Sequence, residues 1–322
     1  MKPLNVCILM GGLSAEREVS LKSGQALLKA CQSLGHSCQV IDVKGPDDLN
    51  TLLLDRPDVT LIALHGGFGE DGHVQAWLEL HDLPYLGSCM KASAIAMDKQ
   101  LTKQLWRSAG LPVLPDVCLT HLNQDVHMAC TDLSYPLCVK PISDGSSIGV
   151  ERVESSGELY PALERTLSLG SAALVEPWVE GIEFTVGMIN HQALPVTRIE
   201  VSSGFYDFKS KYTSGLHRKH IPSGLGDAKE LLIKSQALQA CHALGVRHIA
   251  RVDGLMNDQG EWFFLEINTL PGLTQDSLVP AAAQAMGISF EALVERLIDQ
   301  VNPPTQHLCS TQAQLKDPEF KE

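Results

Sequence analysis

The first part of the chain repeats one pattern, in which an apolar run ends in glycines and a helical pattern follows. Residues 6–10 are continuously apolar and precede two glycines, and apolar or small residues then recur at helical spacing over residues 21–31. Residues 59–64 form a second apolar run, which is followed by HGGFGEDG and another helical pattern. This alternation predicts an α/β fold with a mostly parallel sheet, whose ligands bind beyond the carboxyl ends of the strands.

The middle of the chain changes to paired strands. PLCVKP and SSIGVERV predict two strands joined by a turn around Gly145, and EFTVGMI alternates as a strand does. Residues 202–226 are rich in Gly, Ser, Lys, Tyr and His, which predicts a long ordered loop with a functional role. The last stretch of the chain has little apolar content, which predicts a flexible tail.

A hairpin near the C-terminus carries the strongest candidate chemistry. ARVDGLMNDQGEWFFLEIN predicts two strands with a turn at residues 257–260. Pairing of Met256 with Glu261 would place four polar side chains on one face, namely Arg251, Asp253, Glu266 and Asn268. Two carboxylates and an amide oxygen suit Mg²⁺, which usually keeps positions for substrate phosphates, and arginine binds phosphate. The alternative interpretation is a cross-strand ion pair between the arginine and one carboxylate on a solvated face.

Other candidate residues stand where strands or helices are expected to begin or end. Lys140 precedes a Gly/Ser turn whose N–H groups could cradle phosphates, although the same pattern occurs in ordinary flexible hairpins. Ser14 is predicted to cap a helix, so Glu16 is either a carboxylate that stabilises the first turn or a group that holds a substrate ammonium. His65 is either a core histidine or a substrate contact, and its position at the end of the predicted strand favours contact.

Composition excludes several functional classes. The chain of 322 residues is long enough for two or three domains, and its formal net charge of −13 argues against general attraction to nucleic acid or anionic lipid. The nine cysteines include no CxxC pair, which indicates reduced thiols and a cytoplasmic protein. Nowhere do 18 apolar residues run together, so we expect no membrane span.

Nine motifs in order resemble the D-alanine:D-alanine ligases of the ATP-grasp superfamily, over about residues 5–301. They are GGLSAEREVSLKSG, HGGFGEDG, LPYLGS, AMDKQLTK, VKPISDGSSIGV, VEPWVEGIEFTV, FYDFKSKY, RVD and LEINTLPGLTQDSL. The resemblance implies an ATP-grasp architecture with an N-terminal, Rossmann-like parallel-sheet domain. The implied divisions are an N-terminal α/β substrate-binding domain (1–96), a central ATP-grasp domain (97–181), a C-terminal ATP-grasp domain with the catalytic loop and metal site (182–303), and a flexible tail (304–322).

The family's roles, transferred residue by residue, imply an ATP site, a metal site and two substrate sites. The implied ATP-binding residues are Lys99, Lys140, Glu176, Trp178, Val179, Glu183, Phe205, Lys211, Leu255 and Leu265. The implied ligands of two Mg²⁺ ions, for which Mn²⁺ can substitute, are Asp253, Glu266 and Asn268. The implied substrate-binding residues are Glu16, His65, Arg251, Gly272, Ser277 and Leu278. The implied catalytic residues are Glu16, Ser146, Tyr212, Arg251, Gly272 and Ser277, and among them Glu16, Ser146 and Tyr212 would form a hydrogen-bonded triad that latches the loop over the site.

The implied reaction is the ATP-dependent ligation of two D-alanine molecules through an acyl phosphate, for peptidoglycan precursor synthesis. The family further implies a cytoplasmic homodimer with D-alanine and ATP as its ligands, and neither nucleic acid nor membrane as a partner. The alternatives are a depsipeptide ligase that accepts D-lactate, against which Tyr212 argues, and another ATP-grasp carboxylate–amine ligase. A non-catalytic nucleotide-binding protein would be expected to lack metal ligands, and a dinucleotide-binding protein would need the missing GxGxxG motif.

The sequence departs from the family pattern at three places. Leu273 stands where methionine is commoner, and Gly254 stands where a larger apolar residue is usual. These two changes are expected to alter packing rather than chemistry. HRKHIPSG is an unusual form of the second half of the loop. The sequence therefore does not predict which contacts hold the loop closed over the site.

Overall fold

The structure is a computed structural model that describes residues 2–122, 125–143, 145, 148–201 and 217–301. The strands are β1 (Asn5–Gly11), β2 (Ser37–Val43), β3 (Val59–Ile62), β4 (Tyr85–Leu86), β5 (Val117–Leu119), β6 (Leu137–Pro141), β7 (Glu151–Val153), β8 (Ala173–Pro177), β9 (Ile182–Ile189), β10 (Gln192–Ala193), β11 (Thr197–Val201), β12 (His217–His220), β13 (Ile249–Met256) and β14 (Trp262–Asn268). The α-helices are α1 (Arg17–Ser33), α2 (His73–Leu80), α3 (Met90–Met97), α4 (Lys99–Ser108), α5 (Val126–Ala129), α6 (Ser156–Leu169), α8 (Asp227–Leu244), α9 (Leu278–Ala285) and α10 (Phe290–Asp299), and the 3₁₀ helices are η1 (Pro46–Leu53) and η2 (Gly67–Gly69).

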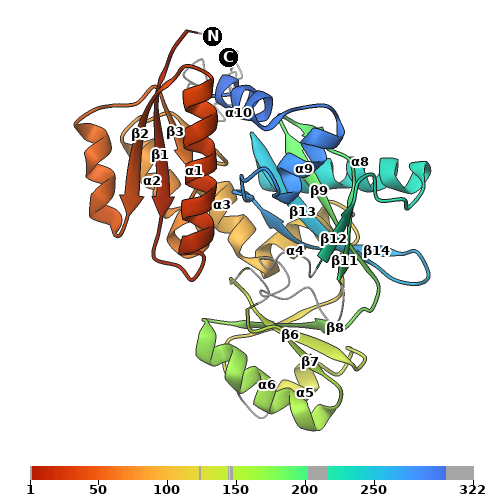
Figure 1. The fold of residues 1–322 in the computed structure, drawn as a ribbon. Helices are drawn as coiled ribbons and strands as arrows, with labels where there is room; N and C mark the ends of the chain where they lie inside the picture. Colours follow the sequence, from red (N-terminus) through yellow and green to blue (C-terminus); the bar gives the residue numbers. More distant parts are fainter. Residues whose placement is uncertain (1, 123–124, 144, 146–147, 202–216, 302–322) are drawn as a thin grey trace, which may run out of the picture.

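The first sheet is parallel throughout, with strand order β2-β1-β3-β4. Residues of α1, α9 and α10 share one apolar core with β1 and β3, and residues of η1 and α2 share a second core with the same strands (Figure 1). Because both faces are covered, these strands are apolar along their length rather than alternating. The predicted α/β fold with an N-terminal parallel sheet is confirmed.

The second sheet has strand order β5-β8-β6-β7, with antiparallel pairing. Helices α5 and α6 lie beside this sheet (Figure 1), and their apolar residues share a core with residues of β6, β7 and β8. The two strands predicted around Gly145 are β6 and β7, but β7 begins only at Glu151, so most of SSIGVERV precedes the strand.

The third sheet has strand order β12-β11-β9-β13-β14, with β10 paired to β9. Helices α3, α4 and α8 pack against it, and Trp106 of α4 is fully buried beside Phe264 of β14. Strand β12 lies inside the segment predicted as loop, so the prediction was wrong for residues 217–220. HRKH carries no apolar alternation, and pairing with β11 holds it as a strand.

The predicted domain bounds at residues 96 and 181 stay a prediction. The structure adds that α4, which falls in the predicted central segment, shares its apolar core with the third sheet. Residues 304–322, the predicted tail, lie outside the described residues. Within the described chain, no helix has the length and apolar composition needed to cross a membrane.

A polar cluster joins the first sheet to the third. The backbone N–H of Gly87 donates to Nδ1 of His248 at 3.0 Å, and Nε of Arg247 donates to the Gly87 carbonyl at 3.1 Å. The Arg247 guanidinium also lies over the ring of Tyr85, 5.6 Å from its centroid. Burial lowers the pKa of His248 to about 4, with the positive charge of Arg247 adding to the effect. The histidine is therefore neutral near pH 7, and its Nδ1 can accept the Gly87 hydrogen bond.

Candidate active site

The hairpin of β13 and β14 places its four polar residues on one face, as predicted. Arg251 lies opposite Asn268, and Asp253 lies opposite Glu266. The predicted register was wrong, however, because Met256 pairs with Trp262 rather than Glu261. A β-bulge near Asp253 and Gly254, with Leu265 as the extra residue, shifts the register by one and restores the shared face.

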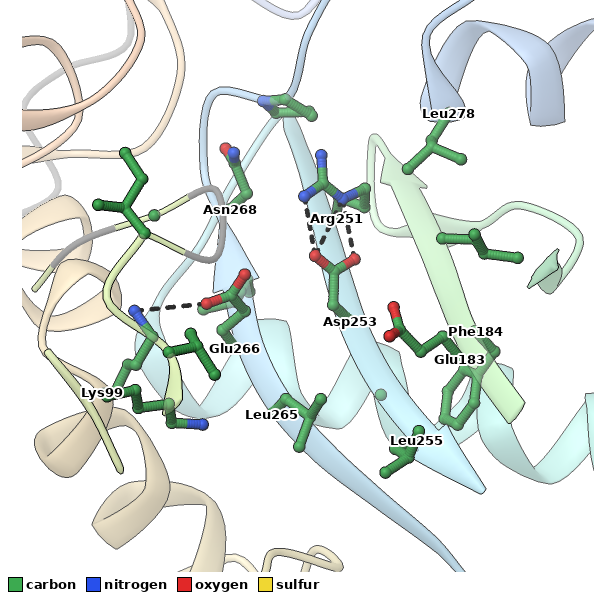
Figure 2. A pocket seen from close by; sticks show the side chains of 18 of the residues that line it. Lys99, Glu183, Phe184, Arg251, Asp253, Leu255, Leu265, Glu266, Asn268 and Leu278 are labelled. Atoms are coloured by element: carbon green, nitrogen blue, oxygen red, sulfur yellow. Dashed lines mark hydrogen bonds and ion pairs between the residues drawn. The ribbon is translucent and has the colours of Figure 1, made fainter. Parts of the chain in front are cut away.

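Asp253 is held by two neighbours. Arg251 donates to it with Nε at 2.8 Å and Nη2 at 2.8 Å (Figure 2). The Thr185 hydroxyl donates to Oδ1 at 2.6 Å. The alternative interpretation foresaw such an ion pair, but it lies within one strand rather than across two. Arg251 and Asp253 are also only 17% and 20% exposed and line a cavity rather than a solvated face.

Glu266 and Asn268 complete this group of oxygen donors. Oε2 of Glu266 lies 3.4 Å from Nζ of Lys99 (Figure 2). Oδ1 of Asn268 accepts from the backbone N–H of Leu270 at 2.8 Å. Within the described chain, no three His, Cys, Asp or Glu side chains are placed to hold a metal ion. A metal site here therefore depends on the amide of Asn268 as its third side-chain donor. An all-oxygen set with two carboxylates fits a hard cation such as Mg²⁺.

A chain of charges runs from the cavity into the interior between β6, β8 and α4. Both Lys140 and Lys103 donate to the carboxylate of Glu176, with Lys103 Nζ at 2.5 Å from Oε2. Lys103 also lies 3.3 Å from Asp116, which Arg107 contacts at 2.5 Å. Burial raises the pKa of Glu176, but the attraction of Lys140 and then of Lys103 outweighs burial and lowers the pKa to about 2.

Apolar and aromatic side chains line the same cavity beside this chain of charges. They include Leu255 and Leu265 of the hairpin and Phe184 of β9 (Figure 2), together with Trp178 and Val179 after β8. The carboxylate of Glu183 lies in the cavity wall near them. The unusual Gly254 is explained here, because a Cβ at this position would lie 2.8 Å from Cε2 and 3.0 Å from Cε1 of the Phe184 ring.

The first sheet contributes Glu16 and His65 to the cavity. Helix α1 begins at Arg17 with Glu16 as N-cap, so the prediction that Ser14 caps the helix was wrong. The Glu16 side chain makes no capping hydrogen bond, although its carboxylate still stands at the N-terminus of α1. Nε2 of His65 lies 3.2 Å from the Ser23 hydroxyl, and its Nδ1 lies 3.5 Å from Glu70.

The segment before α9 forms a further part of the cavity wall. Ser277 is the N-cap of α9, and its hydroxyl accepts from the Thr274 backbone N–H at 3.1 Å. Gly272, Ser277 and Leu278 all line the cavity. The backbone N–H groups at a helix N-terminus favour a carboxylate.

All described residues with an implied role line this cavity, whose volume is about 1120 Å³. Ser146, Phe205, Lys211 and Tyr212 lie outside the described residues, so their roles stay predictions. Sequence reasoning missed Lys103, although its spacing of four residues from Lys99 was a usable signal, since such residues share a helix face. It also assigned no role to Arg218 and Lys219 of β12, which line the cavity.

The chain is similar to known proteins over most of its length. The family model for the D-ala D-ala ligase C-terminus matches residues 105–299. A D-alanine–D-alanine ligase of Pseudomonas fluorescens (strain Pf0-1) is 45% identical over 289 residues, which cover 90% of this chain and 89% of that protein. The crystal structure of the D-alanine–D-alanine ligase of Bacillus anthracis complexed with ATP is 31% identical and superposes with a TM-score of 0.82, covering 92% of this chain and 97% of that one.

A relative with a different second substrate shares the fold as well. The VanG D-Ala:D-Ser ligase of Enterococcus faecalis is 29% identical, with a TM-score of 0.80 over 93% of this chain and 100% of that one. The fold is that of an ATP-grasp ligase. Within this class, the chain belongs to the D-alanine:D-alanine ligase family.

Proposed function

We infer that this chain is an ATP-dependent ligase that joins two D-alanine molecules into D-alanyl-D-alanine for peptidoglycan precursors. One observation carries the inference: a D-alanine–D-alanine ligase is 45% identical over 90% of this chain. The geometry supports it, because the described residues with implied roles come from all three sheets and line a common cavity.

ATP is proposed to bind between the second and third sheets. The adenine would lie among Trp178, Val179, Leu255 and Leu265, where apolar side chains line the cavity. Glu176 and Glu183 would complete the adenosine site, and Lys99 and Lys140 would face the phosphates. Both lysines are 7% exposed, and a buried ammonium interacts with phosphate far more strongly than one in water.

Mg²⁺, or Mn²⁺ in its place, is proposed to be held by Asp253, Glu266 and Asn268. The support is the shared face of the hairpin and its all-oxygen donor set. Two metal ions bound there would neutralise the negative charge of the phosphate oxygens during phosphoryl transfer. Lys99 and Arg251, which now neighbour the two carboxylates, bring further positive charge to the same place.

The two D-alanine molecules are proposed to occupy the opposite end of the cavity from the adenine. Glu16 would pair with the ammonium of the first, and His65 would contact the same molecule. Ser277 and the N-terminus of α9 at Leu278 would receive the carboxylate of the second. The Ser277 hydroxyl is fixed by its hydrogen bonds with Thr274, which favours one orientation for this carboxylate.

The reaction would then proceed in two steps. A carboxylate oxygen of the first D-alanine attacks the γ-phosphorus, the bond to the β-phosphate oxygen breaks, and ADP leaves an acyl phosphate behind. The amine of the second D-alanine, after losing a proton, attacks the acyl carbon, and phosphate leaves from the tetrahedral intermediate. Arg251 and the Gly272 N–H are proposed to stabilise the negative oxygen of this intermediate.

An acyl phosphate hydrolyses when water reaches it, so the chemistry requires a cover. The loop proposed for this task includes residues 202–216, which lie outside the described residues, and its latch of Glu16, Ser146 and Tyr212 stays a prediction. We also keep as proposals the four-part division of the chain, the homodimer and the cytoplasmic location. The last is supported by the need for ATP.

One assay tests the function and separates it from its alternative. Phosphate release and product are measured with ATP and D-alanine, with L-alanine, and with D-alanine plus D-lactate. We expect D-alanyl-D-alanine from D-alanine alone, no ligation of L-alanine and little depsipeptide. Depsipeptide formed as fast as dipeptide at neutral pH would support the D-lactate ligase. No phosphate release with D-alanine, either alone or together with D-lactate, would refute both.

A further inference from the structure

Lys103 is a buried charge for which the reaction described above has no use. Its side chain is 0% exposed, and it lies one helical turn after Lys99 on α4, so both lysines project from the same face of the helix. Lys99 reaches Glu266 of the third sheet, whereas Lys103 reaches Glu176 of the second. Burying a lysine ammonium is strongly unfavourable unless the charge is paired. The partners of Lys103 should therefore show why it is buried.

The charges around Lys103 do not cancel. Lys103, Arg107 and Lys140 are three cations that share two carboxylates, those of Glu176 and Asp116, which leaves one positive charge. Arg107 is 47% exposed and meets solvent at one end of the chain of charges. Lys140 lies at the other end, in the cavity wall.

This arrangement matters because Lys140 has two possible partners. It now donates to Glu176, but its proposed role is to contact nucleotide phosphates. If Lys140 turned to the phosphates and Glu176 had no other cation, a carboxylate only 2% exposed would be left unpaired. Lys103 prevents this, since it stays on the second carboxylate oxygen of Glu176 at 2.5 Å.

We propose that Lys103 is a positioning residue that keeps Glu176 neutralised, so that the ammonium of Lys140 can move from Glu176 to the phosphates of the nucleotide. The inference rests on the proposed function, because it assigns the phosphates to Lys140. Its consequence is specific: loss of Lys103 holds Lys140 on Glu176 and weakens the binding of the phosphates more than the binding of the adenosine, whose proposed site includes Glu176. A lysine that only filled space or held α4 in place would not distinguish the two parts of the nucleotide.

The test compares ligands with and without phosphates in Lys103→Met. Affinity for ADP is measured by calorimetry and affinity for adenosine by ligand-observed NMR, both in buffer that contains Mg²⁺. We expect ADP binding to weaken about tenfold or more, as for one lost charge-assisted hydrogen bond, while adenosine binding changes by about twofold or less. KM for ATP should rise with it, and KM for D-alanine should not. Lys103→Arg, which keeps the charge, should recover part of the loss.

Arg107→Met is the matched control. Arg107 stands on the same helix and, like Lys103, contacts Asp116. Among the described residues, it makes no hydrogen bond or ion pair with Glu176. Its loss should leave the ratio of ADP to adenosine affinity unchanged. An equal loss for both ligands in a folded Lys103→Met protein, or no loss for ADP, would overturn the proposal.

A second comparison is decisive if Lys103→Met alone does not fold because it leaves the buried carboxylate of Glu176 unpaired. Glu176→Gln removes the charge that Lys103 is proposed to neutralise, so adding Lys103→Met to it should not change the ADP to adenosine ratio further. A further fall in this ratio in the double variant would show that Lys103 acts by another route. Wild-type ligase activity is measured in parallel: if ADP binds but no dipeptide forms, the proposed function fails while the binding test of Lys103 still stands.

Discussion

Gly254→Ala tests whether the unusual glycine of β13 is there to make room for an aromatic ring. The added methyl group would meet the Phe184 ring, with Cε2 at 2.8 Å and Cε1 at 3.0 Å, distances that a relaxed Cβ does not adopt. The ring cannot move aside easily, because Phe184 is 1% exposed and packs edge-on against Phe264, which in turn packs against Trp106. The backbone of Gly254 is not in the left-handed region, so the effect isolates packing.

Overpacking of a buried site of this kind costs about 1–3 kcal/mol. For a chain of 322 residues, each kcal/mol lowers the melting temperature by about 1–2 °C. Thermal unfolding of Gly254→Ala should show this decrease, and KM for ATP should rise, because Phe184 and Gly254 both line the cavity. Gly157→Ala in α6, where no described atom lies within 4 Å of the new methyl group, should leave the melting temperature unchanged or slightly higher.

A double variant distinguishes this steric explanation from a general intolerance of β13 to change. Phe184→Leu alone should also destabilise the protein, because it removes part of a buried ring. Combined with Gly254→Ala, however, it frees the space that the methyl group needs, so the two losses should be less than additive. Fully additive losses, or a wild-type melting temperature for Gly254→Ala, would refute the reasoning.

Three further predictions concern the metal, the buried charges and the joint between sheets. Glu266→Gln should lower kcat on the order of 100-fold at ordinary Mg²⁺ concentration with little change in melting temperature, and near-normal turnover would contradict the metal assignment. The pKa of Glu176 is lowered from 4.5 to about 2, so its contribution to stability is complete above pH 4.5 and is lost as pH falls toward 2. As pH falls through this range, the melting temperature of the wild type should therefore decrease more steeply than that of Glu176→Gln. The same dependence of melting temperature on pH in both proteins would count against the pairing of Glu176 with the lysines. Arg247→Met removes the contacts to Gly87 and Tyr85 and should destabilise the protein by about 1–2 kcal/mol, with a higher KM for D-alanine, whereas an unchanged melting temperature and KM would show that the joint is dispensable.

The hairpin illustrates how far sequence patterns carried the prediction of the site. The turn was visible because Asn257 and Gly260 have turn chemistry, and Gly260 does adopt a φ of +78°. The bulge was not visible, because WFFLEI is apolar at nearly every position and gives no signal for the extra residue. The predicted face was correct although the register was not, because the loop is one residue longer than predicted and the bulge adds one residue to β14. These two changes have opposite effects on which side chains share a face.

Long-range partners were the main part that the sequence left open. The spacing of Lys99 and Lys103 shows that both leave one face of a helix, but nothing local shows that their partners are Glu266 and Glu176 on two different sheets. Strand β12 was missed for the same reason, because its stability comes from pairing with β11 rather than from its own composition. Local patterns report on neighbours in sequence, whereas these contacts depend on how the three sheets meet.

The packing of the last two helices has a consequence for how the protein is made. Val279 of α9 and Leu293 and Leu297 of α10 share an apolar core with Ile8 of β1 and Leu27 of α1, and α10 lies alongside α1 in Figure 1. The N-terminal strands therefore leave the ribosome long before the helices that complete this core have been synthesised. Until then, one apolar surface of the nascent chain is incompletely buried, which is the condition under which chaperones bind and chains aggregate. A transcript truncated before α9 should accordingly yield an aggregation-prone chain rather than a smaller folded protein, even though it would encode the whole first sheet.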